Sequence, residues 1–194
     1  MAVIFYDNDH DEDNAFVEGM EDFDDDLDDI SVPLVKISDQ NKALQFGLDE
    51  TPALIYFKRQ IPGIYEGPMS DFKNILKWLK SRKTGDFIQL VSETMLEDII
   101  EQFPYVATFF SGRCDKDNTE CKDKIKTITD GLETINDDVN NVGIEFVKTR
   151  ERRLAKKEYG VTSFPALGLF RNGHYLGFDA DLTNPMQVRG LFLG

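Results

Sequence analysis

The sequence predicts an α/β protein that contains two copies of one fold in series. Two segments carry this prediction, FGLDETPALIYF at 46–57 and YGVTSFPALGLFRNG at 159–173. Three pairs of residues in them share one offset of 113 positions: Gly47 and Gly160, Pro52 and Pro165, Phe57 and Phe170. Each glycine ends a predicted helix and each proline precedes a predicted strand, so both prolines are candidates for a cis peptide bond.

A repeated helix is the second observation. Apolar residues spaced alternately by four and three positions predict one helical face in each half. Five pairs share an offset of 105: Phe16 and Cys121, Met20 and Ile125, Phe23 and Ile128, Leu27 and Leu132, Ile30 and Ile135. A polar insertion at 137–143 then raises the offset between matching positions to 112, so that Val35 aligns with Val147.

The first copy is expected to occupy 1–85. Strands are predicted at 3–6, 32–37, 53–57 and 63–66, and helices at 16–30, 40–46 and 72–83. Asp39 and Ser70 are the expected N-caps of the second and third helices, because their side chains can accept from free backbone N–H groups. Basic residues occupy the last turn of the third helix, where their positive charge interacts favourably with the negative end of the helix dipole. We place the domain boundary at 84–86, where a helix ends and a strand begins at once.

The second copy is expected to occupy 86–194. Its strands are predicted at 87–91, 105–110, 144–148, 166–170 and 174–178, and Asn172-Gly173 predicts a tight hairpin. Helices are predicted after Ser92, at 125–135, around Arg152 and at 186–192. The first copy has no counterpart of the opening strand and helix at 87–103. Because a sheet without them should expose apolar surface, we expect a fragment of a longer repeat protein, with the number of repeats open.

Charge limits the classes of partner. The formal net charge is −14, and the first thirty residues hold thirteen Asp or Glu and no Lys or Arg. Such a segment repels phosphate backbones and anionic lipids, so nucleic acid is not an expected partner. No apolar run approaches the length needed to span a bilayer, and we expect no membrane insertion. Two cysteines are too few for a disulfide framework.

The order of elements in the second copy resembles the thioredoxin fold. YGVTSFPALGLFRNG resembles the segment around that family's cis-proline, and FFSGRC resembles the strand that leads to its catalytic cysteine. The predicted fold class is therefore two thioredoxin-like domains in tandem, the first without its opening strand and helix. Acidic tandem domains of this kind are similar to the non-catalytic domains of the protein disulfide isomerase family and, more distantly, to calsequestrin. The resemblance implies the endoplasmic reticulum or secretory pathway.

The cysteines depart from the family's pattern. The family uses Cys-x-x-Cys at a helix N-terminus, where the dipole lowers the pKa of the first thiol. Cys114 stands at the first position, but Asp117 stands at the second and the next cysteine is Cys121. At the offset of 105, Cys121 matches Phe16, which favours a free buried side chain, and a bond or redox pair with Cys114 is the alternative. The first copy has no thiol.

Two further groups are candidate sites. The resemblance implies that the loops before the cis-prolines bind extended polypeptides, which selects Thr51, Pro52, Phe164 and Pro165. Alternating oxygens in an acidic loop suggest a weak calcium site at Asp7, Asp9, Asp11, Asp13 and Glu18. Glu12 occupies the position that a calcium-binding loop reserves for glycine, so diffuse, weak binding of calcium is the stronger form of this hypothesis. No other cofactor is expected.

Three functions remain in order of preference. The first is a redox-inactive module for polypeptide binding or folding assistance, whose partners are other polypeptides or further repeats of the same protein. The second is a thiol-disulfide oxidoreductase that works through Cys114, and the chain is an enzyme only in this case. The third is an acidic, low-affinity calcium-binding protein. Client identity and compartment are not decided by the residues themselves.

Overall fold

The computed structural model describes residues 1–194, which form an α/β chain of two compact units, Met1–Asp86 and Phe87–Gly194. We call these the first and the second domain, and each is described by itself. The expected boundary, between 85 and 86, lies one residue upstream of this division. None of the helices is both long and apolar enough to cross a lipid bilayer.

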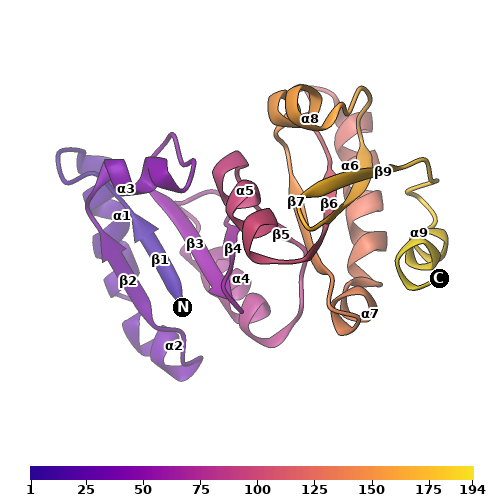
Figure 1. The fold of residues 1–194 in the computed structure, drawn as a ribbon. Coiled ribbons are helices and arrows are strands. Elements are labelled where there is room, and N and C mark those ends of the chain that lie inside the picture. Colours follow the sequence, from indigo (N-terminus) through magenta and orange to yellow (C-terminus); the bar gives the residue numbers. More distant parts are fainter. The chain divides into compact units, whose positions relative to one another are not determined.

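The first domain contains a four-stranded sheet in the order β2-β1-β3-β4 (Figure 1). Its strands are β1 (Ala2–Phe5), β2 (Leu34–Ile37), β3 (Ala53–Lys58) and β4 (Ile61–Ile64). Its helices are α1 (Asp11–Glu21), α2 (Asp24–Asp29), α3 (Gln40–Gln45) and α4 (Phe72–Thr84). Only β1 and β2 are parallel, because a crossover through α1 and α2 joins them. The other two neighbouring pairs are antiparallel.

The second domain contains a five-stranded sheet in the order β5-β7-β6-β8-β9. Its strands are β5 (Gln89–Leu90), β6 (Tyr105–Phe110), β7 (Glu145–Thr149), β8 (Ala166–Arg171) and β9 (His174–Phe178). Its helices are α5 (Glu93–Gln102), α6 (Thr119–Glu133), α7 (Asn136–Asn141), α8 (Arg152–Tyr159) and α9 (Pro185–Leu193). The strands β5, β7 and β6 run parallel, and β8 and β9 are antiparallel additions.

Unusual backbone geometry recurs at equivalent positions of the two domains. Both candidate prolines follow cis peptide bonds, Thr51–Pro52 and Phe164–Pro165. Positive φ angles recur in four pairs: Ser31 with Gly143, Gly47 with Gly160, Arg59 with Asn172, and Gln60 with Gly173. The first pair is 112 positions apart and the others are 113 apart. Three of the four pairs join residues of different type, such as Arg59 with Asn172. The two domains therefore share the backbone conformation at these positions although the side chains differ.

The repeated helix corrects the sequence alignment. Phe23 directly precedes α2 and Ile135 directly precedes α7, while Ile30 and Val142 directly follow the same two helices. Both pairs are 112 positions apart, so the offset of 105 expected for this helix is wrong by one heptad. Two helical turns take about 7.2 residues, so a shift of seven returns nearly the same apolar face and the spacing alone cannot distinguish the two alignments. Phe16 is therefore equivalent to Ile128, and both are buried.

Three smaller expectations are also corrected. The helix expected at 16–30 is two helices, which meet at Asp22 and Phe23. The polar insertion at 137–143 is mostly the helix α7, equivalent to α2, so the extra residues lie earlier in the chain. Asp71, not Ser70, caps α4 and accepts from the backbone N–H of Asn74 at 3.1 Å. Asp39 and Ser92 cap α3 and α5 as predicted.

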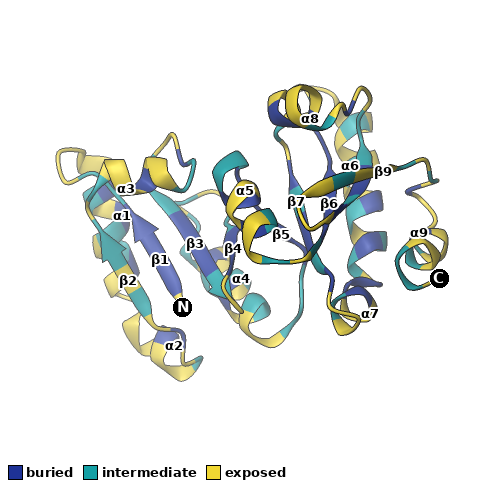
Figure 2. Ribbon diagram, in the orientation of Figure 1, coloured by how far each residue is buried: buried dark blue, intermediate teal, exposed yellow.

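Each domain has its own apolar core (Figure 2). In the first domain, Ile4 and Leu54 of the sheet pack with Met20 of α1 and Leu79 of α4. In the second domain, Phe109 and Leu167 of the sheet pack with Leu132 of α6 and Val188 of α9. The helical pairs α1 with α4 and α6 with α9 thus cover the same face of two equivalent sheets.

Candidate functional site

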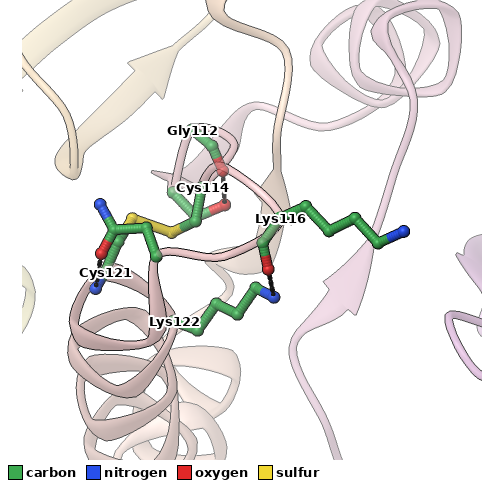
Figure 3. The surroundings of a disulfide bond; sticks show 7 residues. Gly112, Cys114, Lys116, Cys121 and Lys122 are labelled. Atoms are coloured by element: carbon green, nitrogen blue, oxygen red, sulfur yellow. Dashed lines mark hydrogen bonds between the residues drawn. A yellow bond between two sulfur atoms is a disulfide. The ribbon is translucent and has the colours of Figure 1, made fainter.

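The loop between β6 and α6 holds a disulfide bond (Figure 3). Cys114 lies in the loop and Cys121 in the first turn of α6, with 5.7 Å between their Cα atoms. Both side chains are half-buried. The expectation that Cys121 is a free buried side chain is therefore wrong, and the alternative of a bond with Cys114 holds. The wrong expectation came from the alignment at an offset of 105, which matched Cys121 with Phe16. At the correct offset of 112 the buried equivalent of Phe16 is Ile128.

The disulfide lies in an insertion that the second domain has, relative to the first, between β6 and the body of α6. The loop Ser111–Asn118 has eight residues and the equivalent loop Tyr6–His10 has five, while α6 has fifteen residues and α1 has eleven. Asn118 caps α6 by accepting from the backbone N–H of Cys121 at 2.9 Å. Lys122 reaches back and donates to the carbonyl oxygen of Lys116 (Figure 3). The inserted residues are thus tied into one compact loop.

The loop before the cis-proline packs against the start of this segment. Gly112 has φ +70°, and a Cβ there would lie 2.8 Å from Nε of Arg152 and 3.2 Å from Cβ of Phe164. The guanidinium of Arg152 stacks on the ring of Phe164, 5.2 Å from its centre. Gly112, Arg152 and Phe164 therefore meet beside the cis-proline Pro165, from three separate parts of the chain. Phe164 and Pro165 were expected from the sequence, whereas Gly112 and Arg152 were not.

The equivalent site of the first domain has different side chains. Thr51 replaces Phe164 before the cis bond, and Gln40 replaces Arg152 at the first position of the helix that precedes the cis-proline loop. No cysteine is present in this domain. The site is thus a cis-proline loop without the aromatic ring, the guanidinium or the disulfide of the second domain.

Both cis-proline loops leave main-chain groups free. Neither Thr51 nor Phe164 forms a backbone hydrogen bond within the chain, and pairing of β8 with β6 begins only at Ala166. Both residues are partly exposed to solvent. Free N–H and C=O groups in extended backbone are suited to pair with another extended chain.

The acidic residues of the first domain serve the structure of their own loop. Asp13 is buried and accepts from the backbone N–H of Asp7 at 2.8 Å, and Asp7 accepts from Asp9 N–H at 2.9 Å. These carboxylates close the loop between β1 and α1 in the manner of turn-forming side chains. No group of three or more His, Cys, Asp or Glu side chains in the chain is placed to hold a metal ion. The side chains of Asp11 and Glu18 do not join Asp7, Asp9 and Asp13 in a ligand set.

An aromatic cluster and acidic groups flank the second domain's site. Tyr159 packs edge-to-face on Phe170 at 4.7 Å between ring centres and also contacts Phe110 and Tyr175. Burial raises the pKa of Tyr159, and the charge of Glu97 raises it further. Burial also raises the pKa of Glu97, with a further contribution from the neighbouring carboxylate of Glu93. The raised pKa values favour the neutral phenol form of Tyr159 and Tyr175 in this aromatic cluster.

Comparisons with known proteins identify the fold. A scan against protein-family models finds no match to the sequence, and a comparison with curated proteins finds none. Among solved structures, full-length ERdj5 matches with a TM-score of 0.58 and 12% identity over 98% of this chain. This chain spans about a quarter of ERdj5, 26% of its length. Oxidised thioredoxin from Plasmodium falciparum matches 54% of this chain and 94% of its own, with 21% identity and a TM-score of 0.41.

The first thioredoxin domain of mouse protein disulfide-isomerase A4 also matches, over 54% of this chain and 72% of its own, with 12% identity and a TM-score of 0.40. At these identities the likeness concerns the fold alone. The match to ERdj5, which covers 98% of this chain at a TM-score of 0.58, agrees with the two sheets and with the repeat of backbone geometry between the domains. The chain therefore consists of two thioredoxin-like domains in tandem.

Proposed function

We propose that this chain is a redox-inactive, polypeptide-binding module of the secretory pathway, in which the cis-proline loops contact extended clients. The observation that carries the proposal is the combination found in both domains. The main chain of Thr51 and Phe164 is free to pair, whereas the sulfur pair that thiol exchange requires is absent from the first domain and altered in the second. Further repeats of the same protein are the other partners we propose.

The altered pair supports binding without exchange. In a Cys-x-x-Cys site the second thiol lies one helical turn from the first, so that it can release a mixed disulfide quickly. Here the residue three positions after Cys114 is Asp117, and the bonded partner is seven positions away, within α6. The bond closes a surface loop, as a structural disulfide does. A disulfide also suits an oxidising compartment, which supports the proposed location.

Affinity for an unfolded, cysteine-free polypeptide tests the proposal. We expect Pro165→Ala to weaken binding by the second domain and Pro52→Ala to weaken binding by the first, because each change removes the residue that shapes its loop. The matched control is Met186→Ser, which removes an exposed apolar side chain on α9 and should leave binding unchanged. Circular dichroism checks the fold of each variant. Equal affinity of all three variants and the parent chain would contradict the proposal.

A thiol-disulfide oxidoreductase is the second candidate, and the disulfide itself favours it. Cys114 is half-buried and lies two residues from Gly112, which contacts the cis-proline loop. Insulin reduction by the chain in the presence of dithiothreitol separates the candidates. Binding without exchange predicts the rate of dithiothreitol alone, and the same rate for Cys114→Ser. Acceleration that Cys114→Ser abolishes would establish the enzyme.

A further inference from the structure

Two basic side chains of α8, Arg152 and Lys156, have no carboxylate partner within the chain. Both are exposed, and because they are four residues apart they lie on one face of the helix. The guanidinium of Arg152 stacks on the ring of Phe164, 5.2 Å from its centre, directly before the cis bond to Pro165. This face of α8 therefore carries unpaired positive charge that begins beside the cis-proline loop.

The other basic residues near this face are paired. The ion pairs join Arg113 to Glu151 at 3.0 Å, Arg153 to Glu93 at 3.3 Å and Lys157 to Glu158 at 2.9 Å. The charge of Glu97 acts on Tyr159, the last residue of α8, whereas Arg152 is the first. A negatively charged ligand is therefore attracted mainly to Arg152 and Lys156.

The equivalent helical face of the first domain carries no charge. Gln40 is the first residue of α3, as Arg152 is of α8, and Leu44 takes the place of Lys156 one turn later. Both side chains are exposed, so a ligand at this site would meet an amide and an apolar group. The two domains share the helix but not its positive charge.

The cis-proline loop of the first domain is itself acidic. Asp49 and Glu50 directly precede Thr51, and both are exposed. At the offset of 113 that relates the two cis-prolines, the equivalent residues are Thr162 and Ser163, which carry no charge. A carboxylate-rich ligand is therefore repelled at the first site and attracted at the second.

We propose that the cis-proline site of the second domain prefers extended client segments rich in Asp and Glu, and that the site of the first domain disfavours them. This inference rests on the proposed function and names its class of client. A client strand that pairs with the main chain of Phe164 places a side chain opposite that ring, with Cβ atoms about 4.5–5.5 Å apart. A carboxylate there can reach the guanidinium of Arg152. Arginine binds carboxylates through two parallel hydrogen bonds, and stacking on Phe164 orients its plane in advance.

Three cysteine-free peptides of equal length, which differ only in carrying Asp, Asn or Lys at the same positions, test the proposal. NMR titration of the oxidised chain measures each site separately, through the amide shifts of Phe164 and of Thr51. At low ionic strength we expect the second site to bind the Asp peptide about threefold to tenfold more tightly than the Asn peptide. The first site should show the reverse order. High salt should reduce both preferences and leave the Asn peptide unaffected.

Exchange of residues between equivalent positions assigns the preference. Arg152→Gln with Lys156→Leu gives α8 the residues of α3 and should abolish the preference of the second site for the Asp peptide. Its matched control is Arg189→Gln with Lys126→Leu, which makes the same two changes of residue type on α9 and α6 and should keep the preference.

The reciprocal variant acts on the first domain. Asp49→Thr with Glu50→Ser gives this loop the residues of the second domain and should bring its affinities for the Asp and Asn peptides within about twofold of each other. Circular dichroism checks the fold of every variant. Because this variant is expected to gain affinity for the Asp peptide, a failure to fold cannot be mistaken for the expected result.

The outcomes separate this inference from the proposed function. Equal affinity of the second site for all three peptides, each weakened by Pro165→Ala, would overturn the preference for acidic clients and leave polypeptide binding in place. Absence of binding by every peptide would overturn both. A preference for the Asp peptide that survives Arg152→Gln with Lys156→Leu would show that these two side chains do not cause it, and would also overturn the inference.

Discussion

The equivalent strands β2 and β7 show how the same backbone can be a surface in one domain and an interior in the other. β7 has a neighbour on each side and buries Val147 fully, while β2 has one neighbour and leaves Val35 38% exposed. The cause is the presence of β5 and α5 in the second domain only. The difference teaches that the repeat covers every element of the second domain except β5 and α5, and that the first domain is open where the second is closed.

The largest expected effect is a difference in the loss of stability when Val147 and Val35 are each replaced by aspartate. Val147→Asp should destabilise the second domain by about 3 kcal/mol or more, because it buries an unpaired carboxylate. Val35→Asp should cost the first domain less than about 1 kcal/mol, since the side chain reaches water at the open edge. Urea unfolding, followed separately for each domain by hydrogen exchange, measures both. Equal losses would show that β2 is not open.

The disulfide should stabilise only the domain that holds it. Cys114→Ser with Cys121→Ser removes a link that closes an eight-residue loop, which should cost the second domain about 2 kcal/mol. The first domain should not change, because it has its own apolar core and does not contain the bond. Thermal unfolding of the double variant, against the oxidised parent chain, checks the prediction. A loss in the first domain would show that the two units do not fold independently.

The hairpin turns of the two domains allow a test of whether equivalent residues have the same backbone requirement. Gln60 adopts φ +70° where the second domain has Gly173 at φ +79°. Gln60→Gly should stabilise the first domain by roughly 0.5–1 kcal/mol, since glycine accepts this conformation without steric strain. Gly173→Gln should destabilise the second domain by a similar amount, and a Cβ there meets no neighbouring atom, so only the backbone is tested. Two effects of the same sign would contradict the equivalence of the turns.

The acidic helix α2 should weaken the first domain slightly. Asp28 and Asp29 lie in its last turn, near the negative end of the helix dipole, and α7 has Asn140 and Asn141 at the same positions. Asp28→Asn with Asp29→Asn should raise stability by roughly 0.3–1 kcal/mol at low ionic strength, and less in high salt. Calcium at millimolar concentration should raise the melting temperature of the parent chain more than that of the variant. An equal rise would assign the calcium effect to other carboxylates.

The smallest effect is the pH dependence that Glu97 contributes to the second domain. Burial and then Glu93 raise the folded pKa of Glu97 above 4.5, so the fold favours the neutral carboxyl. Its contribution to stability is therefore present below pH 4.5 and declines as the pH rises through the folded pKa. Glu97→Gln should remove this decline without changing the first domain, which has no counterpart of α5. Identical stability profiles of parent and variant between pH 4 and 7 would contradict it.

Sequence reasoning predicted much of this fold from local signals. The two prolines, the glycines at positive φ and the Asn172-Gly173 turn each have a backbone requirement that few residue types meet, so they mark their positions reliably. Helical periodicity was less reliable, because an insertion of seven residues leaves the apolar face almost unchanged. That ambiguity moved Cys121 onto the position of Phe16 and favoured the wrong state for the thiol.

The site itself was only partly predictable. Thr51 and Phe164 were selected because they precede the prolines, which is information along the chain. Arg152 and Gly112 join Phe164 through contacts between distant segments, and no spacing in the sequence indicates those contacts. The acidic loop was open to a calcium hypothesis because sequence shows which carboxylates are present, but not that Asp13 accepts from Asp7 N–H.

The most direct test of polypeptide binding through the cis-proline loops is an NMR titration of the oxidised chain with an unfolded, cysteine-free polypeptide. We predict that the largest amide shifts fall at Thr51 and Phe164 and at their immediate neighbours. The same shifts should appear when Cys114 and Cys121 are both serine, because no sulfur takes part. Shifts confined to other surfaces, or shifts that vanish in the double variant, would contradict the account.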